Sequence, residues 1–233
     1  MISSLEKVAV IVAHPDDEVL GCGGTIRKLT QRGFIVDILI LGEGITSRNK
    51  RRDVNADKSS IKELQRICRK ANKLLGTRSV TLKDFPDNRF DSIDLLDIIK
   101  EIEEFIQDKR PEGVLTHHRG DLNIDHQITN RAVLTACRPT SIWSPDCIMT
   151  FDVLSATEWF FGAREKIFSP NVFIDIEEEL ESKIKALLCY TTENRPFPFP
   201  RSKEALEHQA MRYGAISNQK ASEAFELLYC REK

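Results

Sequence analysis

The sequence predicts an α/β protein with a Rossmann-like three-layer α/β/α sandwich built on a mostly parallel sheet. Two patterns lead to this prediction. Short apolar runs typical of buried strands alternate with longer segments in which apolar residues recur at helical spacing. Strands interleaved with helices in this way form parallel sheets, whose right-handed crossovers cover both faces.

The first 137 residues contain the opening elements of such a sheet. We expect strands at residues 7–14, 34–41, 79–85 and 113–118, and helices at residues 18–31, 59–75, 91–107 and 124–137. Residues 43–57 read as a polar, basic loop. Gly76 ends the second helix, Asp91 or Ser92 caps the third, and Pro111 follows the end of the third.

The last third of the chain changes character. We expect strands at residues 147–153, 171–176 and 224–229, helices at residues 177–190 and 203–213, and a loop at residues 195–202. Three prolines in the segment RPFPFPRS exclude a helix or a central strand there. No internal repeat, low-complexity tract or linker divides the sequence, so we predict one domain over residues 1–233.

The composition is that of an ordinary soluble protein, with 41% hydrophobic and 30% charged residues. The formal net charge of -2 gives no electrostatic basis for binding nucleic acid. The most basic cluster is interpreted as a solvated loop and comprises Arg48, Lys50, Arg51 and Arg52. No segment approaches the roughly 20 apolar residues that span a bilayer.

The cysteines and the N-terminal segment indicate the compartment. Six cysteines are scattered without CxxC spacing, and we interpret them as reduced residues that pack as small hydrophobes. The first apolar run is too short for a secretory signal peptide. We therefore expect a cytoplasmic protein, and a homo-oligomer is compatible with the sequence.

Polar side chains follow two of the predicted buried strands. One strand ends in AHPDDE and another leads into THHRGDLNIDH, which together supply His14, Asp16, Asp17, Glu18, His117, His118, Asp121, Asn123, Asp125 and His126. In open α/β sheets, functional residues gather at the carboxyl ends of strands. An Asp after a strand is also a common helix cap, and His-Pro a common turn. Two clusters at two strand ends nevertheless favour a site over two caps.

These residue types suit a catalytic metal. Catalytic zinc usually takes three protein ligands and leaves a position for water, and His14, Asp17 and His126 meet that count. Bound Zn²⁺ lowers the pKa of its water to roughly 7, so that a nearby carboxylate can complete the deprotonation. Asp16 is the candidate base. Fe²⁺ also suits a site with two His and one Asp.

At these residues the sequence resembles the LmbE/PIG-L deacetylases, whose signature is AHPDD with a later HPDH-like segment. The resemblance covers essentially the whole chain. It implies that His14, Asp17 and His126 bind zinc and that Asp16 is the general base. It further implies hydrolysis of the N-acetyl amide of an N-acetylglucosamine-type amino sugar or conjugate, with release of acetate and a free amine.

One position departs from the family pattern. Asn123 stands where the family often has a His that helps to stabilise the oxyanion. An Asn amide can donate a hydrogen bond to that oxygen but cannot carry a proton. We therefore expect Asp16 to return the proton to the leaving amine. His117 and His118 are alternative helpers or structural residues.

Several further residues have two interpretations each. Arg201, in the proline-rich loop, is a candidate contact to substrate phosphate or sugar hydroxyls, or a simple surface Arg. Asp125 orients a ligand ring or caps a helix, and capping is favoured for Asp121. Glu18 complements a helix dipole. The glycines of residues 21–25 fail the GxGxxG spacing and are expected to let a helix pack closely against the sheet.

The remaining alternatives concern an aromatic cluster and the class of protein. Trp159, Phe160 and Phe161 line a sugar pocket or an oligomer contact, although packing in the core is favoured. A non-catalytic module that binds a sugar or nucleotide sugar is the main alternative to an enzyme. The missing glycine fingerprint counts against a nucleotide-dependent enzyme.

Overall fold

The computed structural model describes residues 5–48, 53–161, 167–191 and 195–232. Its centre is a seven-stranded sheet of order β3-β2-β1-β4-β5-β7-β6. The strands are β1 (Lys7–Val12), β2 (Ile35–Gly42), β3 (Ser79–Phe85), β4 (Gly113–His117), β5 (Cys147–Phe151), β6 (Val172–Asp175) and β7 (Ser222–Cys230). The first five strands pair in parallel, and β7 runs antiparallel to both of its neighbours.

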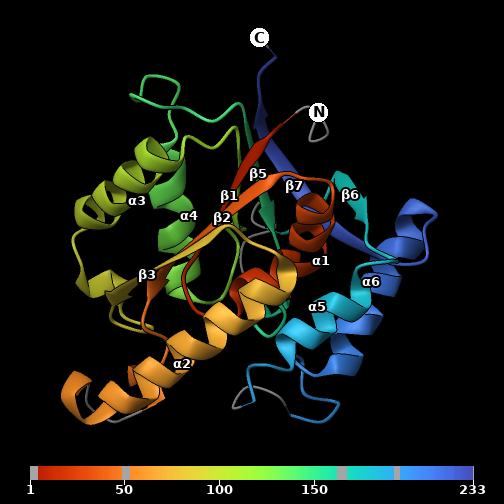
Figure 1. Cartoon of the computed structure of the whole chain (residues 1–233), viewed down its shortest axis with the longest axis horizontal. Coiled ribbons are helices and arrows are strands. Elements are labelled where there is room, and N and C mark those ends of the chain that lie inside the picture. The colour runs from red at the N-terminus through yellow and green to blue at the C-terminus, as the bar shows by residue number, and fades with distance from the viewer. Residues whose placement is uncertain (1–4, 49–52, 162–166, 192–194, 233) are drawn as a thin grey trace.

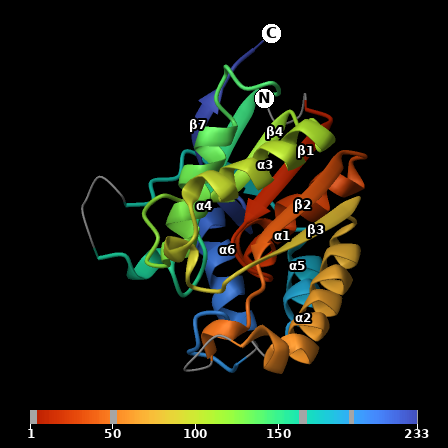
Figure 2. The same cartoon turned by 90° about the vertical axis from the view of Figure 1, so that its left-hand side faces the viewer.

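Helices cover both faces of this sheet (Figures 1 and 2). They are α1 (Asp17–Gln31), α2 (Val54–Leu75), α3 (Leu95–Lys109), α4 (Ile124–Ala136), α5 (Leu180–Leu187) and α6 (Lys203–Ser217), with short 3₁₀ turns at Thr46–Arg48, Phe90–Ser92 and Thr157–Trp159. Figure 1 shows α3 and α4 on one side, and α1, α2 and α5 on the other. The predicted three-layer sandwich is therefore confirmed.

Strand β1 shows why the sheet needs a cover on each face. Val8, Val10 and Val12 point into the core beneath α1, α2 and α5. Ala9 and Ile11 point into a second core beneath α3 and α4. Successive side chains on a strand point to opposite faces of the sheet, so an all-apolar strand must be buried on both faces.

The order of the strands places a crevice beside β1. The chain leaves β1 toward β2 on one side, while β4 pairs with β1 on the other. Loops that follow β1 and β4 therefore diverge at the carboxyl ends of these strands. Such a switch point is where open α/β sheets bind their ligands.

The glycines of α1 pack as expected. A Cβ on Gly21 would lie 2.1 Å from the ring of Phe151, and one on Gly24 would lie 2.8 Å from Ile176. The helix kinks at Cys22, which has φ −145°. Beyond the kink, the carboxylate of Glu223 accepts hydrogen bonds from the backbone N–H groups of residues 24 and 25 at 2.8 and 2.7 Å. This buried carboxylate caps the second part of the helix.

Three predicted helix starts are wrong. Helix α5 begins at Leu180 rather than at residue 177, because residues 177–179 form a turn. Helix α2 begins at Val54 rather than near residue 59, because Asp53 accepts a hydrogen bond from Asn55 N at 3.0 Å and so starts the helix earlier. Helix α3 begins at Leu95 rather than at residue 91 or 92. Residues 90–92 form a 3₁₀ turn and Ile93 is extended, so neither predicted cap starts the helix.

The prediction that residues 159–161 pack in the core is also wrong. Trp159 is 42% exposed and Phe161 is 91% exposed. The segment crosses the end of the sheet rather than a face, because Thr157 Oγ1 donates a hydrogen bond to Asp121 Oδ2 at 2.7 Å. The proline-rich loop at residues 195–202 is irregular, as expected.

Two further sequence features concern the surface. The basic cluster from Arg48 to Arg52 lies outside the residues whose side chains the structure describes. Within the described ranges, no helix is long and apolar enough to cross a bilayer.

We predict that Gly21→Ala destabilises the protein by about 1–3 kcal/mol, because the new methyl group overlaps the buried ring of Phe151. This loss outweighs the roughly 1 kcal/mol that Ala gains over Gly in a helix. Urea denaturation measures the resulting change in the free energy of unfolding. Gly23→Ala is the matched control, since its Cβ would lie 3.2 Å from Lys183 Cγ and 3.4 Å from Val19 Cγ1, which a small shift of the Lys183 side chain accommodates. Equal stabilities of the two variants would contradict the packing argument.

Candidate metal centre

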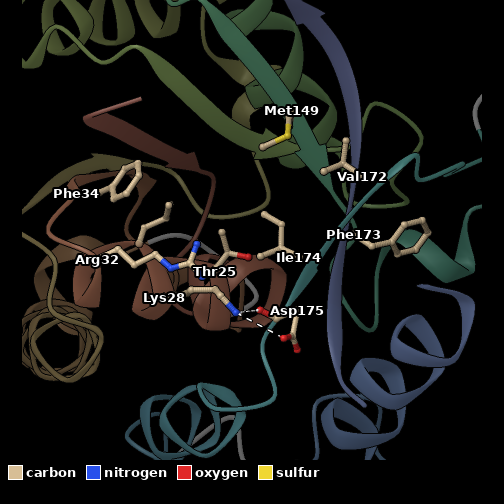
Figure 3. Close-up of a pocket in the computed structure, with 10 residues that line it drawn as sticks. Thr25, Lys28, Arg32, Phe34, Met149, Val172, Phe173, Ile174 and Asp175 are labelled. Atoms are coloured by element: carbon tan, nitrogen blue, oxygen red, sulfur yellow. Dashed lines mark hydrogen bonds and ion pairs between the residues drawn. The ribbon is translucent and has the colours of Figure 1, made fainter. Parts of the chain in front are cut away.

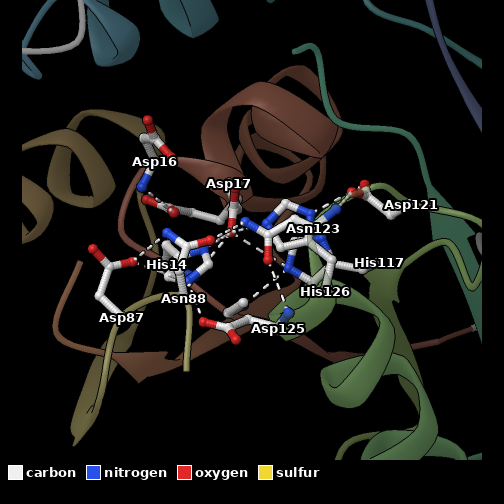
Figure 4. A network of polar contacts seen from close by, with 12 residues as sticks. His14, Asp16, Asp17, Asp87, Asn88, His117, Asp121, Asn123, Asp125 and His126 are labelled. Atoms are coloured by element: carbon white, nitrogen blue, oxygen red, sulfur yellow. Dashed lines mark hydrogen bonds and ion pairs between the residues drawn. The ribbon is translucent and has the colours of Figure 1, made fainter. Parts of the chain in front are cut away.

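The three predicted metal ligands converge at the switch point. His14 follows β1, Asp17 opens α1, and His126 lies in the first turn of α4 after β4. Asp17 Oδ2 lies 3.5 Å from His14 Nδ1 and 3.2 Å from His126 Nε2. All three residues are buried. Figure 4 shows the two imidazole rings and this carboxylate pointing toward one another.

A carboxylate fixes the other nitrogen of each histidine. His14 Nε2 hydrogen-bonds Asp125 Oδ2 at 2.9 Å, and His126 Nδ1 lies 3.0 Å from Asp121 Oδ2. Because an ionised carboxylate only accepts, each of these ring nitrogens carries the proton. When the rings are neutral, as metal binding requires, the opposite nitrogens present lone pairs to the space beside Asp17. Carboxylates commonly orient metal-ligating histidines in this manner.

These contacts decide between the two interpretations of Asp121 and Asp125. Asp125 orients His14, and its other oxygen accepts from Phe90 N at 2.9 Å. The helix-capping role favoured for Asp121 is wrong, because the N-cap of α4 is Asn123. Asp121 instead accepts from the backbone N–H of Asn123 at 2.8 Å and lies against His126.

The charges of the cluster favour a bound cation. Burial alone would lower the pKa of His14, but hydrogen bonds to Asp125 and Asp17 raise it to about 10. Burial alone would also lower the pKa of His126, but the charges of Asp17 and Asp121 raise it to about 9. Buried carboxylates in excess thus attract positive charge, which a divalent metal ion supplies as well as protons do.

The donor geometry fits a tetrahedral metal. Bonds of about 2.0–2.1 Å in a tetrahedral zinc site place neighbouring ligand atoms about 3.3–3.5 Å apart. The separations of 3.2 and 3.5 Å from Asp17 Oδ2 are close to these values. Among the described residues, Asp17 Oδ1 and His126 Nε2 are buried polar atoms without a hydrogen-bond partner. The residues therefore fit the metal that the sequence predicts.

A second trio of potential ligands shares His14 and adds Asp87 and Asp125. Asp87 Oδ1 lies 3.4 Å from His14 Nε2. That nitrogen already donates its proton to Asp125 at 2.9 Å, so it has no lone pair for a metal. The trio with Asp17 is the better metal centre.

Asp16 points away from its neighbour Asp17, as Figure 4 shows. Its backbone has φ 105°, a left-handed conformation that side chains rarely adopt. Its carboxylate accepts a hydrogen bond from Arg201 Nη1 at 3.0 Å, and its N–H donates to Glu18 Oε2 at 3.1 Å. Strain of this kind persists only where the surroundings enforce it, and it is common at functional sites. The adjacent carboxylates therefore have different partners, Arg201 for Asp16 and the two histidines for Asp17.

Glu18 has a larger role than the expected complement to the helix dipole. It is fully buried, and burial raises its pKa to about 7. Besides holding Asp16 N, its carboxylate accepts from Asn72 Nδ2 at 2.8 Å and from Tyr190 OH at 2.9 Å. Glu18 thus ties the strained turn to α2 and to the segment after α5.

The side chain of Asn123 is oriented by its capping role. Its Oδ1 accepts from Asp125 N at 2.8 Å, so its amide nitrogen must point the other way. That nitrogen donates to Asn88 Oδ1 at 2.9 Å and borders the pocket described below. A hydrogen-bond donor is therefore held at the site by the same interaction that starts the helix.

The contacts of the two neighbouring histidines favour the structural alternative. His117 Nε2 accepts from Ala13 N at 2.9 Å, and the ring stacks on His126 with centroids 3.9 Å apart. Burial, followed by the charge of His126, lowers its pKa to about 4. His118 instead lies 2.9 Å from Glu226 on β7.

A polar cavity of about 180 Å³ opens beside the cluster. It is lined by His14, Pro15, Asp16, Gly44, Ser47, Leu64, Asp87, Asn88, Asn123 and Arg201. Asp87 and Asn88 are absent from the sequence-based site, although they follow β3 directly. The rule that functional residues gather at strand ends would have found them.

The larger cavity, of about 530 Å³, lies elsewhere, between α1 and the strands β5 and β6 (Figure 3). Apolar side chains such as Phe34, Met149 and Ile174 dominate its lining. It contains none of the His and Asp residues of the cluster. The smaller, polar cavity is therefore the candidate site.

A buried His and Asp trio beside a second carboxylate, at the switch point of an α/β sheet, is an arrangement that metal-dependent hydrolases use. Residues 9–137 match the PIG-L family, described as GlcNAc-PI de-N-acetylase. The chain belongs to this family. The match contains every residue of the cluster from His14 to His126.

Individual relatives agree with this assignment. The chain is 28% identical to a diacetylchitobiose deacetylase of Thermococcus kodakarensis, over 97% of this chain and 84% of the relative. It is also 28% identical to a probable N-acetyl-alpha-D-glucosaminyl L-malate deacetylase of Bacillus cereus, over 77% of this chain and 80% of the relative. These relatives favour the enzyme over the non-catalytic binding module.

A solved structure supports the fold. The N,N'-diacetylchitobiose deacetylase from Pyrococcus horikoshii, solved with an inhibitor, superposes with a TM-score of 0.79 at 20% identity. The alignment covers 98% of this chain and 85% of that one. The fold is thus shared across nearly the whole chain.

We predict that His126→Ala abolishes stoichiometric metal binding, because it removes one of three ligands. The loss of affinity should exceed the roughly 10–100-fold that loss of an outer hydrogen-bond partner costs. Elemental analysis after dialysis measures the metal content, with near one metal per chain for the unchanged protein. His118→Ala removes another buried histidine that lies outside the trio and should keep the metal. Full metal content in His126→Ala would contradict the assigned ligand set.

Proposed function

We propose that this protein is a zinc-dependent N-deacetylase of N-acetylglucosamine-type amino sugars or their conjugates, releasing acetate and a free amine. The convergence of His14, Asp17 and His126 beside the separate carboxylate of Asp16 carries the proposal. The family and its sugar-deacetylating relatives support the substrate class. Two His and one Asp match the three-ligand set of catalytic zinc, and Fe²⁺ takes the same ligand types.

A metal ion held by the trio would polarise the acetyl carbonyl and lower the pKa of a water molecule. Asp16 lines the same cavity. We propose that its carboxylate accepts a proton from the water molecule that attacks the carbonyl carbon. Arg201 Nη1 donates a hydrogen bond to this carboxylate and so holds it at the cavity. Asp16 then returns the proton to the leaving nitrogen.

The developing oxyanion needs a hydrogen-bond donor. We propose that Asn123 Nδ2 supplies it, exchanging its present partner Asn88 for the substrate oxygen. Arg201 remains a candidate substrate contact, because its guanidinium lines the cavity while bonding Asp16 and Ser155. Its planar fork suits sugar hydroxyls or a phosphate.

We predict that Asp16→Asn keeps the metal but lowers the hydrolysis rate by about 10²–10⁴-fold, the usual contribution of a general base. Acetate release from N-acetylglucosamine and from N,N'-diacetylchitobiose measures the rate, and elemental analysis measures the metal. Asn is nearly isosteric with Asp and leaves the trio intact. Undiminished turnover in this variant would rule out Asp16 as the base.

We predict that Asn123→Ser lowers kcat by about 10²–10³-fold while the unfolding midpoint stays close to that of the unchanged protein. Ser caps helices about as well as Asn, yet its short hydroxyl cannot replace the amide donor. Asn123→Ala is the control, since it should lose both the rate and about 1 kcal/mol of stability. If Asn123→Ser kept full kcat, the oxyanion would have to be held by other groups.

A further inference from the structure

Two cysteines lie opposite each other at the end of the sheet away from the catalytic cluster. Cys147 is the first residue of β5, and Cys230 is the last residue of β7. The antiparallel register of these strands pairs Cys147 directly with Cys230. Figure 1 shows β7 running beside β5, with the C-terminus just beyond it.

The hydrogen bonds of the ladder define the type of this pair. One step outward, Arg231 N donates to Asp146 O at 2.8 Å. Hydrogen-bonded and non-hydrogen-bonded pairs alternate along an antiparallel ladder, so the cysteines form a non-hydrogen-bonded pair. In such pairs the Cα atoms lie about 4.5 Å apart, with both side chains on one face. Disulfides span Cα separations of about 4.4–6.8 Å.

The surroundings hold the two thiols in this register. Arg231 Nε donates to Asp146 Oδ1 at 2.7 Å, and its Nη2 donates to Ser144 O at 3.0 Å, which fastens the end of β7 to β5. Burial raises the pKa of the Cys147 thiol to about 12, and the adjacent Cys230 adds to the rise. Cys147 is buried and Cys230 is exposed. An oxidant from solvent therefore meets Cys230 first.

We propose that Cys147 and Cys230 are an oxidation site that closes into a cross-strand disulfide on reaction with a low-molecular-weight disulfide such as oxidised glutathione. Cys230 attacks one glutathione sulfur, which breaks the S–S bond and releases one glutathione thiol. Cys147 then attacks the Cys230 sulfur and releases the second glutathione. Two protein thiols are oxidised, one disulfide is reduced to two thiols, and the two cysteine protons pass to the glutathione products.

The disulfide would join the two ends of a long segment that contains β5, α5, α6 and most of β7. Closing a long loop restricts the unfolded chain strongly, so the oxidised protein should be more stable than the dithiol form. Under reducing conditions the same pair stays as two thiols. The C-terminal strand would therefore be fastened according to the redox state.

The experiment incubates the purified chain with excess oxidised glutathione, alkylates the remaining thiols and digests the protein without reduction. We expect mass spectrometry to find the Cys147 and Cys230 peptides linked, with the loss of two hydrogens. The unfolding temperature should rise by at least about 5 °C and return to its starting value with dithiothreitol.

Two variants make the test specific. Cys230→Ser replaces an exposed side chain, so it should fold normally yet lose both the linked peptide and the thermal shift. Cys189→Ser is the matched control, because it removes another cysteine that is not fully buried and should retain both the linked peptide and the thermal shift. The proposal is overturned if Cys230 stops at the glutathione adduct while Cys147 is alkylated only after unfolding, or if Cys230→Ser still shows the shift.

Discussion

The turn between β1 and α1 is the constraint on which the rest of the site depends. It must end a fully buried strand, begin a helix, and send two adjacent carboxylates in different directions within four residues. The left-handed backbone of Asp16 achieves this, with φ 105°. A regular helix start would have placed both carboxylates on the first turn, and Asp16 would not reach Arg201 while Asp17 faces the two histidines.

Buried polar groups from distant parts of the chain hold this strained turn. Glu18 binds Asp16 N and receives hydrogen bonds from Asn72 and Tyr190, which belong to segments on the α1 side of the sheet. A buried carboxylate is costly unless such donors satisfy it. Farther along α1, Glu223 caps the kinked half of the helix and pairs with Lys183. The C-terminal third of the fold therefore supports the first loop of the sheet.

The sequence predicts those features that depend on local periodicity and on the position of polar residues at strand ends. Buried strands, the order of elements and the approach of His14, Asp17 and His126 follow from these two patterns. The helix starts at residues 54 and 95 do not follow from these patterns. A side-chain hydrogen bond at Asp53 sets the first, and a 3₁₀ turn before residue 95 delays the second. The partners of buried carboxylates depend on tertiary packing, which a single sequence does not encode locally.

The exposed aromatic residues illustrate the same limit. Three aromatic residues in succession are typical of a core, yet the path of residues 153–161 is set by polar bonds that cross the end of the sheet. The hydrogen bond from Thr157 to Asp121 also supports the carboxylate that lies against His126. A surface segment that looks apolar in sequence thus contributes to the metal centre through its one buried hydroxyl.

Asn123 shows how a structural requirement can shape the chemistry. At the N-cap of α4 an Asn is among the best residues, and its capping bond leaves the amide nitrogen facing the cavity. An amide cannot carry the proton, so another group at the cavity must do so. Among the described residues that line the cavity, the titratable groups other than Arg201 are His14, Asp16 and Asp87. His14 is committed to Asp125 and to the metal trio, and Asp87 accepts from Ser47. Asp16, which Arg201 holds on a strained turn, is therefore the residue that we propose for both the base and the acid step.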